Sequence, residues 1–278
     1  MSPKRKLNLS LLKGVTHGRN GDYQTWMLAA AGLSLLLIAV YSIFNVVENI
    51  IDDSDRFEEV SLPNFAAIPS VKERKEAFFS FLEPFVIEAN GDILEEREAA
   101  LKLQQYFDRN GSLNRKRLEA FNELRDKYGL DELESAEAAA FEELLARVDT
   151  IPVSLALAQA AIESGWGTSR FARQGNNLFG MWCYDKGCGI VPKRRPSGKT
   201  YEVAAYRSPY ESFLAYLSNL NTNEVYSDLR DIRSTHRENG VEPSGRDLAA
   251  GLTRYSQERW TYVQKVRNMI SSNGLENR

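Results

Sequence analysis

The sequence of 278 residues is poor in the side chains that usually hold metals, with two cysteines, two histidines and four methionines. His17 and His236 are both distant in sequence from the cysteines, so the ligand spacing of a zinc site is absent. An excess of one charge is also lacking, since 35 basic and 38 acidic side chains leave a net charge of −3. Proteins that bind nucleic acid neutralise phosphates with surplus lysine and arginine. These absences predict a protein without a metal, a cofactor or a nucleic-acid partner.

Long apolar runs are scarce, and the longest lies near the N-terminus. Residues 26–47 are 22 consecutive uncharged residues, which as a helix would span roughly 33 Å, enough for a bilayer core of about 30 Å. Residues 1–25 hold five basic side chains and one acidic side chain, and acidic residues follow the run. A cleaved signal peptide is the alternative, but its apolar part would be about 7–15 residues long and end in small residues. We expect 1–25 to be a cytoplasmic tail and 26–47 a transmembrane signal anchor in the inner membrane, with the remaining chain facing the periplasm or cell exterior.

The chain between this run and residue 150 divides into two parts. Residues 48–69 begin acidic and end with two prolines, which is typical of a short stalk. Residues 70–149 have helical patterns, starting with a capping box formed by Ser70 and Glu73. Glycines interrupt the pattern and predict several separate helices, the first break falling at Gly91. We expect this helical region to pack on a following domain, and it is the part that could bind a protein partner.

A second uncharged run, over residues 150–162, ends at a single carboxylate, Glu163. Alanine and leucine in this run, Pro152 at its start and Gly165 after it predict a buried helix over 153–164. Burial disfavours an ionised carboxylate, and the negative end of the helix dipole acts in the same direction. Both effects would raise the pKa of Glu163, as a general acid that works near neutral pH requires. We therefore predict that Glu163 is the acid of a glycosidase.

After this helix the pattern changes to short strands. Residues 182–191 and 200–206, joined through a Pro-Ser-Gly turn, predict a β-hairpin. Helical patterns return over 208–220 and 261–270. Residues 150–273 are therefore predicted to be one α+β domain that is mostly helical.

Both cysteines lie in the hairpin region, with four residues between Cys183 and Cys188. A small disulfide loop is expected if the domain is exported, because disulfides persist in oxidising compartments. Two free thiols in a loop are the alternative if the domain stays in the cytoplasm.

Two motifs identify a resemblance to a known family. Gln159-Ala-Ala-Ile-Glu-Ser-Gly-Trp-Gly and Asn176-Asn-Leu-Phe-Gly resemble the glucosaminidases of glycoside hydrolase family 73, with similarity over about residues 150–270. The resemblance implies a lysozyme-like α+β fold and an endo-β-N-acetylglucosaminidase that cleaves the β-1,4 bond after GlcNAc in peptidoglycan. It also implies that Glu163 is the general acid.

The family resemblance implies roles for further residues, both within the two motifs and outside them. A second carboxylate is placed on the hairpin, where Glu202 is the candidate and Asp185 and Glu211 are reserves. The substrate's own 2-acetamido group is the alternative nucleophile. A tyrosine near the acid corresponds to Tyr255, although Tyr-Ser-Gln-Glu stands here where the family commonly has Tyr-Ala-Thr-Asp. The candidate substrate-binding residues, each of which could instead belong to the core, are Ser164, Trp166, Asn177, Phe179, Trp182 and Tyr206.

Two other functions remain open from the sequence. A lytic transglycosylase is also lysozyme-like and uses a Glu-Ser pair, but it cuts the other glycosidic bond with a single acid. The second motif and the hairpin with Glu202 argue against it. A catalytically silent, membrane-anchored protein that binds peptidoglycan or serves as a scaffold is the other alternative, and the helical region 70–149 keeps it open.

Overall fold

A computed structural model describes Phe57 and residues 60–278, which belong to the same unit of the chain. The predicted cytoplasmic tail and transmembrane anchor, 1–25 and 26–47, lie outside the described residues, as does most of 48–59. Within the part described, no helix is both long and apolar enough to cross a membrane. The end of the predicted stalk packs on the domain instead of extending from it, because the rings of Phe57 and Phe65 are buried in the main core.

Helix α2, Val71–Asn110, is the longest element described and runs for 40 residues. Its N-cap is Ser70, whose hydroxyl accepts the backbone N–H of Glu73, as the capping box predicts. The predicted break at Gly91 is wrong, because the helix continues through this residue and ends only at Gly111, which has a φ of 71°. A single interior glycine costs about 1 kcal/mol, which the burial of one apolar face outweighs. That buried face comprises Phe78, Phe79, Leu82, Phe85, Val86 and Ala89.

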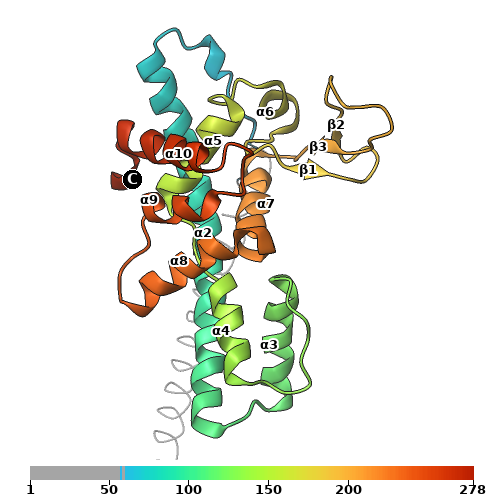
Figure 1. Cartoon of the computed structure of the whole chain (residues 1–278), viewed down its shortest axis with the longest axis vertical. Coiled ribbons are helices and arrows are strands. Elements are labelled where there is room, and N and C mark those ends of the chain that lie inside the picture. Colours follow the sequence, from blue (N-terminus) through green and yellow to red (C-terminus); the bar gives the residue numbers. More distant parts are fainter. Residues whose placement is uncertain (1–56, 58–59) are drawn as a thin grey trace, which may run out of the picture. The chain divides into compact units, whose positions relative to one another are not determined.

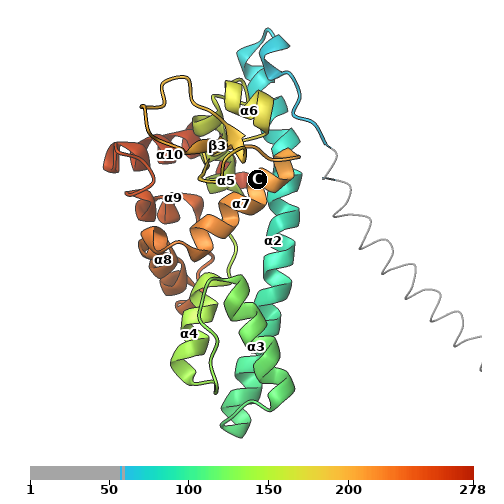
Figure 2. The same cartoon turned by 90° about the vertical axis from the view of Figure 1, so that its right-hand side faces the viewer.

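The C-terminal half of α2 forms a small helical subdomain with α3, Arg115–Lys127, and α4, Ala138–Arg147. This subdomain has a core of its own, centred on Phe121 and Phe141, whose ring centroids are 4.4 Å apart. Figure 2 shows α2 running beside both parts of the unit, with α3 and α4 along its C-terminal half and α5 and α7 along its N-terminal half.

The main core surrounds α5, Val153–Ser164, in which nine of 12 residues are buried. Helices α2 and α10 pack closely against it, which explains why a helix without charge suits this position. The other helical elements of the main part are η2 Phe65–Ala67, α6 Arg170–Gly175, α7 Pro209–Thr222, η3 Glu224–Tyr226, α8 Ser227–Glu238, α9 Gly245–Leu248, η4 Ala249–Leu252, α10 Trp260–Ser272 and η5 Leu275–Asn277.

The β region is a small three-stranded antiparallel sheet and not the two-stranded hairpin that we predicted. Its strands are β1 Trp182–Cys183, β2 Gly189–Ile190 and β3 Glu202–Ala204, in the order β1-β3-β2. The last strand therefore lies between the other two, and Val203 pairs with both Trp182 and Ile190. Both β1 and β2 run antiparallel to β3, and the loop that joins them is the segment that the two cysteines enclose. The sheet extends from the side of the helical core (Figure 1). The described chain is thus mostly helical with a small sheet, consistent with the expected α+β class.

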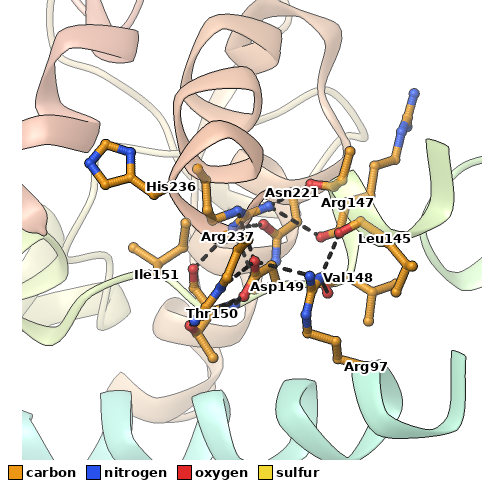
Figure 3. A network of polar contacts seen from close by, with 12 residues as sticks. Arg97, Leu145, Arg147, Val148, Asp149, Thr150, Ile151, Asn221, His236 and Arg237 are labelled. Carbon is orange, nitrogen blue, oxygen red and sulfur yellow. Dashed lines mark hydrogen bonds and ion pairs between the residues drawn. The ribbon is translucent and has the colours of Figure 1, made fainter. Parts of the chain in front are cut away.

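A buried ionic network joins the helical subdomain to the main part (Figure 3). Its centre is Asp149, which is 1% exposed and lies between α4 and α5. The carboxylate accepts N–H groups of Arg237 at 2.9 and 3.1 Å and is 3.5 Å from Arg97 and 3.8 Å from Arg233. These arginines come from α2 and α8. The network therefore joins the segment just before α5 to both α2 and α8, and it fixes the position at which α5 begins.

Candidate active site

Glu163 lies in the last turn of α5, where a sharp left-handed turn ends the helix. Gly165, Trp166 and Gly167 all have positive φ, of 57°, 60° and 69°. Ser164 is fully buried, and its hydroxyl donates to the Ala160 carbonyl at 2.6 Å and accepts the N–H of Gly167 at 2.8 Å. Ser164 therefore stabilises the turn that presents Glu163, and no face of it is open to a substrate.

The carboxylate of Glu163 has two different environments. Its Oε1 accepts the hydroxyl of Tyr262 at 2.7 Å. Its Oε2 lies beside Gly180, where an added Cβ would be 3.8 Å away. Burial raises the pKa of Glu163, and the hydrogen bond from Tyr262 opposes this by favouring the ionised form. A carboxyl group with a raised pKa and one oxygen held by a neutral donor is suited to give up a proton from the other oxygen.

A chain of buried hydrogen bonds fixes the direction of the Tyr262 proton. Tyr216 donates to Gln159 Oε1 at 2.7 Å, and Gln159 Nε2 donates to the Tyr262 oxygen at 3.0 Å. Because that oxygen already accepts from an amide, its single proton points to Glu163. Burial raises the pKa of Tyr262 far above its ordinary value, so the phenol remains a donor at any working pH.

Tyr262 and Gln159 belong to the candidate site, although neither was predicted from the sequence. Tyr255 was expected beside Glu163, but its hydroxyl donates to the Phe179 carbonyl at 3.0 Å. Tyr255 stacks on Tyr262 with ring centroids 5.3 Å apart and planes 8° from parallel, so it supports the tyrosine that contacts Glu163. One signal was present: Gln159 is the only amide in the helix and stands four residues before Glu163, on the same face.

We expect Tyr262→Phe to move the alkaline limb of the pH–rate profile. The substitution removes the bond that lowers the pKa of Glu163, so the pKa should rise and the acid should stay protonated to higher pH. Loss of a hydrogen bond to a charged group should also lower kcat, by roughly tenfold to a hundredfold. The profile of kcat against pH checks both. Tyr255→Phe is the matched control, because it removes a phenol that does not touch Glu163, and its limb should not move. A limb that moves only in Tyr255→Phe would reverse the two roles.

Asn177 and Phe179, two of the predicted substrate-binding residues, are both buried. The Asn177 amide donates to the carbonyls of Met181 at 2.9 Å and Ala204 at 2.8 Å, which ties the loop after α6 to the sheet. Phe179 stacks on Tyr216 with centroids 3.9 Å apart. Both residues therefore hold the segment beside Glu163 in place through buried contacts, and neither presents an exposed surface.

The predicted aromatic contacts differ in exposure. Trp166 is half-buried between Phe78 and Phe79, and Lys75 Nζ lies 4.8 Å from its ring centroid. Tyr206 is half-buried, and burial raises its pKa to about 12. Trp182 is the most open of the three, with 51% of its surface exposed.

The disulfide between Cys183 and Cys188 is present in the structure. Glu202, the candidate second carboxylate, lies beneath the loop that this disulfide closes and is only 5% exposed. Its Oε1 accepts the N–H of Gly187 at 3.3 Å and its Oε2 accepts the N–H of Gly189 at 2.9 Å. Both oxygens are therefore occupied by backbone donors, an arrangement that stabilises the loop.

The reserve carboxylates lie elsewhere. Asp185 is exposed on the disulfide loop, and Glu211 accepts the backbone N–H of Arg207 at 2.8 Å and pairs with its guanidinium. Among residues 57 and 60–278, no group of three histidine, cysteine, aspartate or glutamate side chains is placed to hold a metal ion.

The sequence profile of the glucosaminidase family, described as mannosyl-glycoprotein endo-beta-N-acetylglucosaminidase, matches residues 138–275. Protein bax of Escherichia coli (strain K12) is 33% identical over 213 residues, which make up 77% of this chain and 74% of that protein. The chain belongs to the glucosaminidase family. This membership confirms the resemblance to glycoside hydrolase family 73 and implies a hydrolase domain that acts on peptidoglycan.

One solved structure is also similar, the catalytic domain of the autolysin Auto from Listeria monocytogenes. It is 21% identical, with a TM-score of 0.40 and coverage of 83% of this chain and 96% of that chain. The glucosaminidase profile begins at the start of α4, so most of the helical subdomain precedes it.

Proposed function

We propose that the protein is an endo-β-N-acetylglucosaminidase that cleaves the β-1,4 bond after GlcNAc in peptidoglycan, with Glu163 as general acid. The observation that carries the proposal is the setting of this carboxyl group. Burial raises its pKa, Tyr262 donates a hydrogen bond to Oε1, and Oε2 lies beside Gly180, which has no side chain. The substrate class follows from the glucosaminidase family.

In the proposed reaction, Glu163 donates the proton on Oε2 to the glycosidic oxygen as the bond to the anomeric carbon breaks. The carbonyl oxygen of the sugar's own 2-acetamido group attacks the anomeric carbon and forms a cyclic intermediate. The Glu163 carboxylate then takes a proton from water, which opens the intermediate and leaves a reducing GlcNAc end. Tyr262 keeps its bond to Oε1 throughout and stabilises the carboxylate in the middle of the cycle.

We favour the acetamido group over Glu202 as nucleophile because both carboxylate oxygens of Glu202 accept backbone N–H groups. Glu202→Gln puts an amide N–H against one of these donors and should lower stability by about 1–3 kcal/mol, while kcat falls only a few-fold. Thermal unfolding and kcat, measured together, check this. A fall in kcat of more than about a hundredfold in a folded variant would assign Glu202 a role in the reaction.

The identity of the new sugar end tests the function. Purified full-length protein would be incubated with isolated peptidoglycan, and the fragments would be reduced with borohydride and identified by mass spectrometry. The proposal expects reduced GlcNAc at the new ends. Anhydro-muramic ends would move the protein to the lytic transglycosylases, and reduced muramic acid would make it a muramidase. No new ends would favour a silent binding protein.

We also propose that residues 26–47 anchor the protein in the inner membrane with the glucosaminidase domain outside. The disulfide between Cys183 and Cys188 supports an oxidising compartment, and the uncharged run supports the anchor. Protease added to intact spheroplasts should digest the domain. Digestion that occurs only after lysis would contradict this placement.

A further inference from the structure

Three aromatic side chains form a small open cavity on the sheet. Trp182, Tyr184 and Tyr201 line it, and its volume is about 260 Å³. Trp182 is 51% and Tyr184 76% exposed. Large aromatic surface of this kind is costly to leave in water unless a ligand covers it. None of the bonds described around Glu163 uses these rings.

The rings are arranged as a corner. Trp182 and Tyr201 have centroids 4.7 Å apart and planes at 88°, so one ring stands as a wall beside the other. A pyranose ring has one face rich in C–H groups and a rim of hydroxyl groups. The flat ring of a tryptophan can stack on the C–H face, while tyrosine hydroxyls reach the rim. The cavity is of the size for one such ring.

The corner is held rigid by the strands behind it. Trp182 pairs with Val203 in the sheet, and Tyr184, the first residue after β1, lines the same cavity as Trp182. Cys183 lies between the two aromatics and is tied to Cys188. Beneath this disulfide loop, Glu202 holds two backbone N–H groups. A pre-formed aromatic corner loses little conformational entropy when a sugar binds.

The corner is also close in the chain to the acid. Gly180, beside Glu163 Oε2, is only two residues before Trp182, a distance of roughly 7 Å along an extended chain. We propose that Trp182, Tyr184 and Tyr201 form a subsite for one N-acetylhexosamine ring of the glycan strand whose bond is cut at Glu163. The inference rests on the proposed function and adds the place on the protein at which the glycan strand binds.

Binding to a β-1,4-linked GlcNAc tetramer tests the subsite without catalysis. The parent is full-length Glu163→Gln, titrated by calorimetry. Adding Trp182→Leu removes the flat ring but keeps an apolar side chain, and should weaken binding about tenfold. Adding Trp182→Phe keeps a ring and should restore most of the affinity. Tyr106→Leu is the control, because it removes a partly exposed aromatic from the helical subdomain, and should change nothing.

A second measurement uses the disulfide. Reduction frees the loop that carries Tyr184, so the affinity of the parent should fall several-fold while the weakened Trp182→Leu variant changes less. The subsite is overturned if Trp182→Leu binds as tightly as the parent, if leucine and phenylalanine act alike, or if the parent does not bind the tetramer. Failure of the proposed function looks different: wild-type protein would bind the tetramer in a Trp182-dependent manner and yet leave no reduced GlcNAc ends on peptidoglycan.

Discussion

Glu163→Gln should lower the rate of peptidoglycan cleavage by about a hundredfold to ten-thousandfold, the usual contribution of a general acid. The glutamine amide has the same shape and can still accept the Tyr262 hydroxyl, but it cannot transfer a proton to the glycosidic oxygen. Release of soluble fragments per unit time measures the effect. Glu119→Gln is the matched control, since this glutamate is exposed in the helical subdomain and pairs with Arg115. Substantial residual activity in folded Glu163→Gln would reject Glu163 as the acid.

The same substitution should stabilise the protein near neutral pH. Burial raises the pKa of Glu163 above 4.5, the value for an unperturbed glutamate, so ionisation costs the folded state free energy. The neutral carboxyl group contributes fully to the stability of the folded state below about pH 4.5. This contribution is lost as the pH rises through the raised pKa of Glu163. Glutamine stays neutral throughout. Its melting temperature should therefore exceed that of the wild type near neutral pH, and the difference should disappear in acid. A lower melting temperature near neutral pH would contradict the raised pKa.

Asp149→Leu is expected to have the largest effect on stability. Burial would raise the pKa of Asp149, but the bonds from Arg237 and the charges of Arg233 and Arg97 hold it below its ordinary value. Removing the carboxylate leaves these guanidinium groups without an acidic partner in a buried place, and breaking such a cluster costs about 3–5 kcal/mol. Even with Asp149 beside it, burial lowers the pKa of Arg233 to about 10, so the charged form of this arginine already depends on its acidic partner. The melting temperature should fall by roughly 6–20 °C.

A control and a pH series make the Asp149 prediction specific. Asp126→Leu removes an exposed aspartate from the helical subdomain and should change the melting temperature little. Because the pKa of Asp149 is lowered, its carboxylate contributes fully to stability above about pH 3.8, the ordinary pKa of an aspartate. This contribution is lost as the pH falls through the lowered pKa. The difference in melting temperature between the wild type and Asp149→Leu should therefore become smaller in acid. Equal melting temperatures for the two aspartate variants near neutral pH would show that the network does not join the two parts.

The sequence was sufficient for features that depend on one continuous segment. An uncharged run that ends at one carboxylate predicted both the buried helix α5 and the position of Glu163 at its end. The disulfide loop was also predictable, since its cysteines have only four residues between them. The family followed from two short motifs, and the comparisons confirm it.

Features that depend on distant partners were missed. Tyr262 meets Glu163 across 99 positions, and the choice between it and Tyr255 depends on how the segment before α10 turns. Strand alternation predicted on which face of the sheet Glu202 lies. It did not predict that the backbone of Gly187 and Gly189 covers the Glu202 carboxylate, because the strand that contains Gly189 was not expected. The length of α2 was misjudged because the burial of an apolar face outweighs the local cost of Gly91.

The most direct test of the account is digestion of peptidoglycan in water enriched in heavy oxygen, with immediate borohydride reduction and mass spectrometry. Wild-type protein and Glu163→Gln would be compared at equal concentration. A glucosaminidase that uses Glu163 as its acid should place one heavy oxygen atom at each new GlcNAc end formed by the wild type, and the variant should form no such ends. Ends without heavy oxygen, ends on muramic acid, or equal yields from the two proteins would contradict a glucosaminidase in which Glu163 is the acid.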